Sequence, residues 1–217
     1  MSTDTLTEVW PAARLTDMAV EWLRGHYPGA LIIPEFVCGA MGNARVDVAA
    51  IMPDGIHGVE VKGDGDTHAR LPSQGPLFSA VCSTVHLIWT PNKPDYNTKH
   101  CPPYWGRLHI NEGQVTSAYY DCWRDCLLSP YQLLGTIWRK EMKRLCVRLR
   151  VSHDPKRSTV AQMTRDIADN IPLKEIRNGV CEILRERDWS QPTMNGGEPR
   201  RILQAAGSAT AQPSEDS

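Results

Sequence analysis

The stretch from Arg45 to Lys62, RVDVAAIMPDGIHGVEVK, constrains the fold of this chain more than any other part of it. On both sides of a Met-Pro-Asp-Gly sequence, residues alternate with the two-residue period of a β-strand. Proline presets φ and glycine tolerates a positive φ, so these four residues suit the turn of a hairpin. The sequence therefore predicts two antiparallel strands joined by a tight turn.

The predicted register brings two carboxylates together. If the isoleucines that flank the turn lie opposite each other, Asp47 faces Glu60, and Lys62 follows on the same face. Facing residues have Cβ atoms about 4.5–5.5 Å apart, where two like charges repel by roughly 3 kcal/mol at an effective dielectric constant of about 20. We therefore expect a positive group between them, which is Lys62, Arg45 or a divalent cation. A magnesium ion held by one or two carboxylates, with other positions left for water and phosphate oxygens, fits this arrangement.

The motif and its flanks resemble a known family. Asp47, the hairpin and then Glu60-Val61-Lys62 match an acid, hairpin and acid-x-lysine pattern, so the chain resembles the PD-(D/E)XK nuclease superfamily. The residues that follow are similar to its sce7726/MmcB-like family, at Asp66-Thr67, Arg70-Leu71, Gln74, Phe78 and the strand from His86 to Trp89. Later segments, PYWGRLHI and LLGTIWRKEMKRL, are also similar, and the likeness covers roughly residues 12–188.

This resemblance implies a fold and an activity. The implied fold is α/β, with a restriction-endonuclease-like core in which helices flank a mixed central sheet, and with a helical C-terminal extension. The implied activity is that of a metal-dependent DNA nuclease in DNA repair, recombination or phage DNA metabolism, with Mg²⁺ or Mn²⁺ as cofactor and DNA as partner. The alternative is a DNA-binding protein that keeps the fold without the chemistry.

The resemblance also assigns catalytic and metal-binding roles. Asp47 and Glu60 would hold the metal ion, joined by the carbonyl group of Val61 and by Glu35 as a further carboxylate. Lys62 would steer or help to deprotonate the attacking water and stabilise the transition state. For Glu35, which follows a proline in an apolar segment, an exposed charge on an edge strand is the other interpretation.

Gln74 matches a glutamine that orients groups at the active site in this family. In this chain Gly75 and Pro76 follow it directly. Proline is accepted at the first position of a helix, so we expect a helix to begin at Pro76 and Gln74 to lie at its mouth.

Basic residues suggest where DNA would bind. Arg45 would contact phosphate or neutralise the carboxylates, and Arg70 would contact phosphate or lie exposed in a loop. Eight Lys and Arg residues stand against two acids between positions 139 and 157, although the whole chain has a net charge of −1. We predict a phosphate-binding face there, formed by Arg139, Lys140, Lys143 and Arg144. A solvated helix flank is the alternative.

The rest of the chain divides into predicted segments. Helical periodicity covers residues 12–25, strands are expected at 30–37 and 84–89, and a second hairpin at 106–119. The last third reads as helices, with an apolar stripe from Leu133 to Leu145 and two shorter helices at 158–168 and 172–187. We therefore predict a flexible lead-in at 1–11, the core at 12–120, a helical region at 121–188 and a disordered tail at 189–217.

Composition narrows the class of protein. No apolar run approaches the ~18 residues that a membrane span needs, so we expect a cytoplasmic protein without membrane association. Seven scattered cysteines fit reduced thiols better than a disulfide framework. A zinc site built from Cys101, His109, Cys122 and Cys126 is a further alternative, although no C-x2-C pair is present. A homodimer or a complex with partner proteins is compatible with the sequence.

Overall fold

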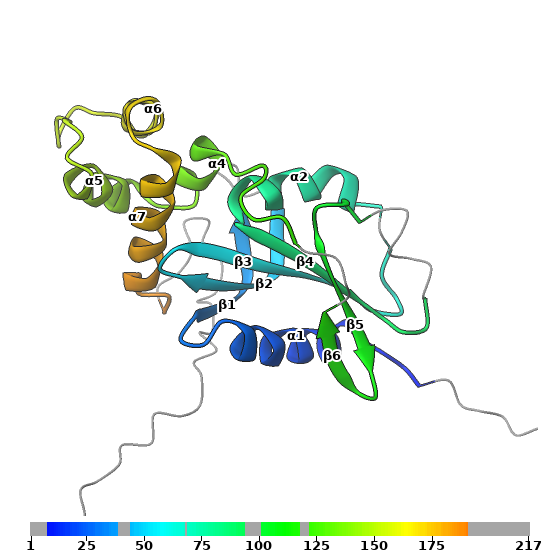
Figure 1. The fold of residues 1–217 in the computed structure, drawn as a ribbon. Coiled ribbons are helices and arrows are strands. Elements are labelled where there is room, and N and C mark those ends of the chain that lie inside the picture. The colour runs from blue at the N-terminus through cyan, green and yellow to red at the C-terminus, as the bar shows by residue number, and fades with distance from the viewer. Residues whose placement is uncertain (1–7, 39–43, 68, 94–100, 118–121, 191–217) are drawn as a thin grey trace, which may run out of the picture.

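A computed structural model of the chain describes residues 8–38, 44–67, 69–93, 101–117 and 122–190. Its centre is one six-stranded sheet with the strands in chain order (Figure 1). The strands are β1 (Leu31–Cys38), β2 (Ala44–Met52), β3 (Gly55–Lys62), β4 (Thr84–Trp89), β5 (Gly106–Asn111) and β6 (Gln114–Ser117). Strands β3, β4 and β5 are parallel to one another, while the other neighbours are antiparallel. The predicted α/β class with a mixed sheet is confirmed.

Helices cover both faces of this sheet. Helix α1 (Ala12–His26) lies on one face, and α2 (Leu71–Val81) and α4 (Pro130–Leu134) lie on the other (Figure 1). Helices α5 (Arg139–Arg148), α6 (Val160–Asn170) and α7 (Leu173–Glu186) form the C-terminal group, with α7 next to β2 and β3. Two apolar clusters result, a smaller one under α1 and a larger one that continues from α2 into the C-terminal helices. Burial of these clusters is the main favourable contribution to folding.

The hairpin of β2 and β3 has the predicted register. Ile51 lies opposite Ile56, and the ladder runs to the pair Val48 and Val59. Nearly every residue of β3 is buried, because the strand has partners on both sides and helices on both faces. The recorded ladder ends at that pair and does not include Asp47 and Glu60. Their carboxylates are nevertheless near each other, because Asp47 is one of the groups that raise the pKa of Glu60.

In both β1 and β2, the alternation of side chains between the two faces of the sheet is interrupted at the level of Asp47. Val46 and Ala49 belong to the same apolar cluster, although an unbroken strand would point residues three apart to opposite faces. On β1 the corresponding break occurs at Glu35, whose φ of 51° is in the left-handed region. A glutamate rarely adopts this conformation, which costs on the order of 1 kcal/mol or more. Asp47 lies at this irregularity, and its carboxylate accepts the backbone N–H of Val61 on β3.

Two helix boundaries differ from the predictions. Helix α2 begins at Leu71, so Gly75 and Pro76 lie inside it and the predicted start at Pro76 is wrong. A Cβ atom at Gly75 would lie 3.3 Å from the ring of Trp105, so glycine serves close packing there rather than a turn. The predicted apolar stripe from residue 133 to 145 is shared by two helices, α4 and α5, because Gly135 follows the last turn of α4.

The predicted lead-in and tail are shorter than expected where the structure describes them. Trp10, expected in the flexible lead-in, is 5% exposed and belongs to the cluster under α1. Trp189, expected in the disordered tail, is buried with its ring 6.3 Å from that of Phe36. The remainder of both predicted segments, residues 1–7 and 191–217, lies outside the described residues.

Candidate functional site

Asp47, Glu60 and Lys62 meet at the end of the hairpin that lies away from its turn, and we call these three residues the carboxylate site. Lys62 Nζ donates to Glu60 Oε1 at 2.5 Å, and the N–H of Val61 donates to Asp47 Oδ2 at 2.7 Å. The side chains of Glu60 and Lys62 are only 4% and 13% exposed. The strand positions that the sequence indicated are therefore brought together in one partly buried cluster.

The electrostatics of this cluster favour the arrival of another positive charge. Burial and the neighbouring Asp47 carboxylate raise the pKa of Glu60 to about 7. Burial also raises the pKa of Asp47, although the N–H of Val61 and the ammonium group of Lys62 act against this. Among the described residues no N–H or O–H group donates to the buried Glu60 Oε2, and a side-chain hydrogen bond with Asp47 adds to the raised pKa of Glu60. One lysine thus serves two carboxylates, and a buried acceptor is left for a proton or a cation.

The chemistry of these donors fits Mg²⁺ or Mn²⁺. Hard divalent cations prefer carboxylate oxygens, and Mg²⁺ is commonly held by one or two of them with water and substrate phosphates in its other positions. Asp47 and Glu60 provide such a pair. Among the residues that the structure describes, no group of three or more His, Cys, Asp or Glu residues is arranged to hold a metal ion. A metal bound here would therefore rely on these two carboxylates, with the backbone of Val61 between Glu60 and Lys62.

Glu35 and Arg45 lie beside the carboxylate site but face solvent. Their side chains are 55% and 60% exposed, and Arg45 Nε is 3.5 Å from Glu35 Oε2. The negative charge of Glu35 contributes to the raised pKa of Asp47, so it acts on the site through space. In this arrangement Glu35 is an exposed charge on edge strand β1 that pairs with an arginine.

Arg70 and Gln74 belong to the start of α2. Arg70 is the exposed residue directly before the helix, and its carbonyl accepts the backbone N–H of Gln74 at 2.9 Å. Gln74 is half-buried in the first turns of α2 rather than at the mouth of the helix. Both residues follow the loop that leaves Lys62, and their roles remain predictions.

The cations of α5 lie apart from the carboxylate site. Arg144 pairs with Glu186 of α7, Arg139 donates to the carbonyl of Ser158, and Lys143 donates to the carbonyl of Pro155. Lys140 is exposed on the same helix. Helix α5 lies near α7, at the side of the sheet where the hairpin turns (Figure 1). The two predicted features are therefore on different parts of the molecule, and three of the four residues of the predicted basic face have partners within the C-terminal region.

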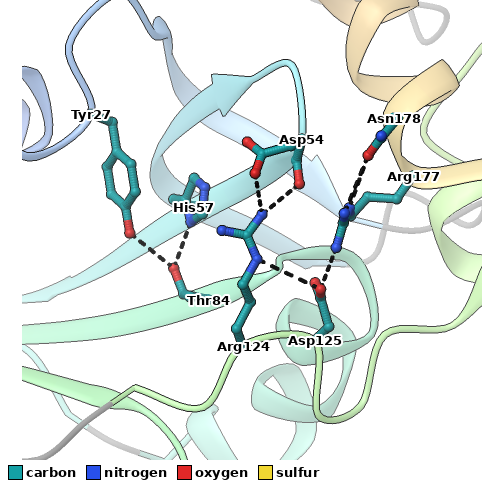
Figure 2. A network of polar contacts seen from close by, with 8 residues as sticks. All are labelled: Tyr27, Asp54, His57, Thr84, Arg124, Asp125, Arg177 and Asn178. Carbon is teal, nitrogen blue, oxygen red and sulfur yellow. Dashed lines mark hydrogen bonds and ion pairs between the residues drawn. The ribbon is translucent and has the colours of Figure 1, made fainter. Parts of the chain in front are cut away.

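A second polar cluster lies at the turn end of the hairpin, and the sequence did not indicate it (Figure 2). Arg124 donates to Asp54 Oδ2 at 2.8 Å and to its carbonyl at 2.6 Å, and its Nε lies 3.7 Å from Asp125 Oδ2. Arg177 of α7 pairs with the same Asp125 oxygen. We call Asp54, Arg124, Asp125 and Arg177 the turn network. Its partners lie 52 and 70 residues apart in the chain, so no local pattern could reveal it.

His57 lies beside the turn network. Its Nδ1 shares a hydrogen bond of 2.8 Å with Thr84 Oγ1, and its ring stacks on that of Tyr27 at 3.9 Å between centroids. Burial lowers the pKa of His57 to about 4, and the charge of Arg124 acts in the same direction. The ring is therefore neutral at physiological pH.

The zinc alternative is not supported by the geometry. Cys101, His109, Cys122 and Cys126 are all described, and they do not come together in a group that could hold a metal ion. Cys122 Sγ instead donates to the carbonyl of Val85, and the His109 ring packs edge-on against Trp89. All seven cysteines are free thiols, as predicted.

Comparison with known proteins shows the family. Residues 13–204 match the family described as bacteriophage P4 protein cII. The chain belongs to this family. Among solved structures, an SPO1766 protein of unknown function from Silicibacter pomeroyi is 21% identical, with a TM-score of 0.44; the match covers 68% of this chain and 98% of that one. The curated proteins contain no match. In the described part of the P4 cII-family chain, no helix is long and apolar enough to cross a membrane.

Proposed function

We propose that this member of the P4 cII family is a metal-dependent nuclease that hydrolyses phosphodiester bonds of DNA. One observation carries the proposal: Glu60 is buried beside Asp47 with one oxygen on Lys62, while no N–H or O–H donor in the described part of the chain reaches the other. A purely structural ion pair would gain from satisfying both oxygens, whereas a site that receives a cation keeps one free. The phage origin of the family's named protein supports a role in phage DNA metabolism, and repair and recombination are the related settings.

Each residue of the carboxylate site has a role in this proposal. Asp47 and Glu60 would hold Mg²⁺ or Mn²⁺, which when bound lowers the pKa of a water ligand and neutralises charge on the phosphate. Glu60 must lose its proton, which its pKa of about 7 allows at physiological pH. Lys62 uses one N–H on Glu60, so two others remain to orient the water and to stabilise negative charge on the phosphate. DNA would approach over Arg45 and Arg70, which are exposed.

The test is DNA cleavage by the wild type and Lys62→Ala. Supercoiled, linear and single-stranded DNA are incubated with each protein in Mg²⁺, in Mn²⁺ and in EDTA. We expect cleavage by the wild type only with metal, and a loss of roughly 10²–10⁴ in kcat for Lys62→Ala, with a smaller effect on DNA affinity. Lys174→Ala, which changes an exposed lysine of α7, is the matched control and should cut normally.

Metal binding can be measured directly, and this second test does not depend on activity. Mn²⁺ titration followed by electron paramagnetic resonance should show a site in the wild type and in Lys174→Ala that is lost in Asp47→Asn. A Lys62→Ala protein that cuts DNA as fast as the wild type would contradict the proposal. Cleavage that persists in EDTA would contradict the role of the metal.

A DNA-binding protein without catalysis is the second candidate. The observation that favours it is the ion pair of Lys62 and Glu60, which stabilises the pair in the absence of any metal. Such a protein would bind DNA equally well in Mg²⁺ and EDTA and would give no Mn²⁺ signal. Under either candidate function we propose a cytoplasmic location. The seven free thiols support this, because thiols stay reduced in such a compartment.

A further inference from the structure

The residues before α1 are attached to the end of β3 by one carboxylate, that of Asp64. Its Oδ2 accepts the N–H of Trp10 at 2.7 Å, and its Oδ1 accepts the hydroxyl of Thr90 at 2.5 Å. The amide of Asn92 donates to the same carboxylate at 3.1 and 3.2 Å, and the N–H of Asp64 donates to the carbonyl of Trp10 at 3.0 Å. We call Trp10, Asp64, Thr90 and Asn92 the Asp64 latch.

The Asp64 latch holds the backbone at the carbonyl of Lys62 and directly after it. The N–H of Thr90 donates to the carbonyl of Lys62 at 2.9 Å, and the preceding residue of β4, Trp89, pairs with Lys62 in the sheet. Gly63 is enclosed, because a Cβ atom there would lie 2.6 Å from the backbone nitrogen of Ala12. Lys62 is therefore followed by a segment that the first described residues of the chain hold against β4.

The same N-terminal residues support β3 from its other face. Trp10 is buried in the cluster that contains Val59 and Val61, and these two residues alternate with Glu60 and Lys62 along the strand. The guanidinium group of Arg14 lies 3.7 Å from the centroid of the Trp10 ring and covers it. Trp10 thus fixes the back of the strand while Asp64 fixes its end.

We propose that Asp64 is a positioning residue for the carboxylate site, which joins residues 8–10 to the end of β3 and thereby fixes the Lys62 ammonium group against Glu60. This inference rests on the proposed nuclease function. Asp64 is not a metal ligand in it, because both carboxylate oxygens are taken by N–H and O–H donors. A displacement of a catalytic group by about 1 Å can cost on the order of 100-fold in rate, so a distant anchor of Lys62 matters for chemistry.

The test compares Asp64→Ala and Asp64→Asn with Asp17→Ala, which removes an exposed carboxylate from α1. We expect kcat for DNA cleavage to fall roughly 10- to 100-fold in Asp64→Ala, with KM within about twofold. Asp64→Asn should recover part of this loss, because its amide oxygen can still accept one of the hydrogen bonds. Assays run well below each protein's melting temperature, so that unfolded protein does not contribute.

The second measurement is the rate at which acetic anhydride acylates Lys62, read by peptide mapping. We expect acylation to be several-fold faster in Asp64→Ala than in the wild type and unchanged in Asp17→Ala, because a released strand end frees the ammonium group from Glu60. If the wild type cuts no DNA, the nuclease proposal fails while the acylation rates still decide whether Asp64 positions Lys62. Unchanged kcat, or unchanged Lys62 acylation, in Asp64→Ala would overturn the inference.

Discussion

The two ends of the β2–β3 hairpin carry charged clusters of opposite character. At the turn end, two aspartates meet two arginines, and the hairpin, the loop before α4 and helix α7 are joined (Figure 2). At the other end, two carboxylates meet one lysine, and both acids have raised pKa values. The turn network is balanced within the protein, whereas the carboxylate site is short of one positive charge. The difference separates a cluster whose charges are paired within the fold from one that, in the proposed function, receives a metal ion.

Breaking the turn network should have the largest effect on stability. In the described part of the chain, Arg177→Ala leaves Asp125 with Arg124 as its neighbouring cation, and the buried Asp125 Oδ1 has no hydrogen-bond partner there. We expect the free energy of unfolding to fall by about 3 kcal/mol, because breaking a largely buried pair strands the other charge. Urea unfolding followed by circular dichroism measures this, with Arg165→Ala on the exposed side of α6 as control. A loss no larger than that of the control would mean that solvent already screens the network.

Neutralising Glu60 in the carboxylate site should raise the free energy of unfolding, whereas Arg177→Ala lowers it. The pKa of Glu60 in the folded protein, about 7, is above its usual value of 4.5, so the folded state holds the proton more tightly. The contribution of this group to stability is full below pH 4.5 and is lost as pH rises to about 7. In EDTA, Glu60→Gln should therefore gain stability relative to the wild type as pH rises, by up to roughly 3 kcal/mol.

The measurement is urea unfolding of both proteins at pH 5 and pH 8. Groups outside the interacting pair of Glu60 and Asp47 titrate in both proteins alike, so the difference between the proteins isolates this pair. A difference between the two proteins that stays constant with pH would show that Glu60 is ionised in the fold. Glu182→Gln, an exposed acid of α7, serves as the control.

His57 should have a smaller effect on stability than Glu60, and its contribution should be lost as pH falls rather than as pH rises. Its pKa of about 4 in the fold is below the usual 6.5, so the folded state favours the neutral ring. The corresponding stability is present above pH 6.5 and is lost as pH falls towards 4, with a loss of roughly 1 kcal/mol at about pH 5.5. His57→Gln should remove this part of the acid sensitivity, as thermal melts at pH 5.5 and 7.5 would show. Equal acid sensitivity in both proteins would refute the assignment to His57.

The hairpin and its register could be predicted because the information is local. Alternating polarity, the Pro-Asp-Gly turn and the two isoleucines all lie within one stretch of sequence, and the period of two fixes which side chains share a face. The same argument identified Asp47, Glu60 and Lys62 as neighbours. For the arrangement of distant strands, only a mixed sheet was predicted, from the resemblance, and the order of its strands was not.

The features that could not be predicted depend on distant partners. Asp64 bonds to residues 54 positions before it and 26 after it, and the sequence around Trp10 reads as a loose lead-in because its contacts lie elsewhere in the chain. Gly75 and Pro76 read locally as a helix start, but the packing of Trp105 against α2 decides the conformation. The basic residues near 139–157 were visible in the sequence, while their pairing with α7 was not.

The left-handed conformation of Glu35 places stability and the proposed activity in competition at a single position. Glycine adopts this φ freely, so Glu35→Gly would relieve backbone strain and remove a negative charge that acts on Asp47. An engineer who sought a more heat-resistant protein would choose that change, and in doing so would alter the field at the carboxylate site. At this position, stability alone is therefore a poor guide to which residue serves the protein best.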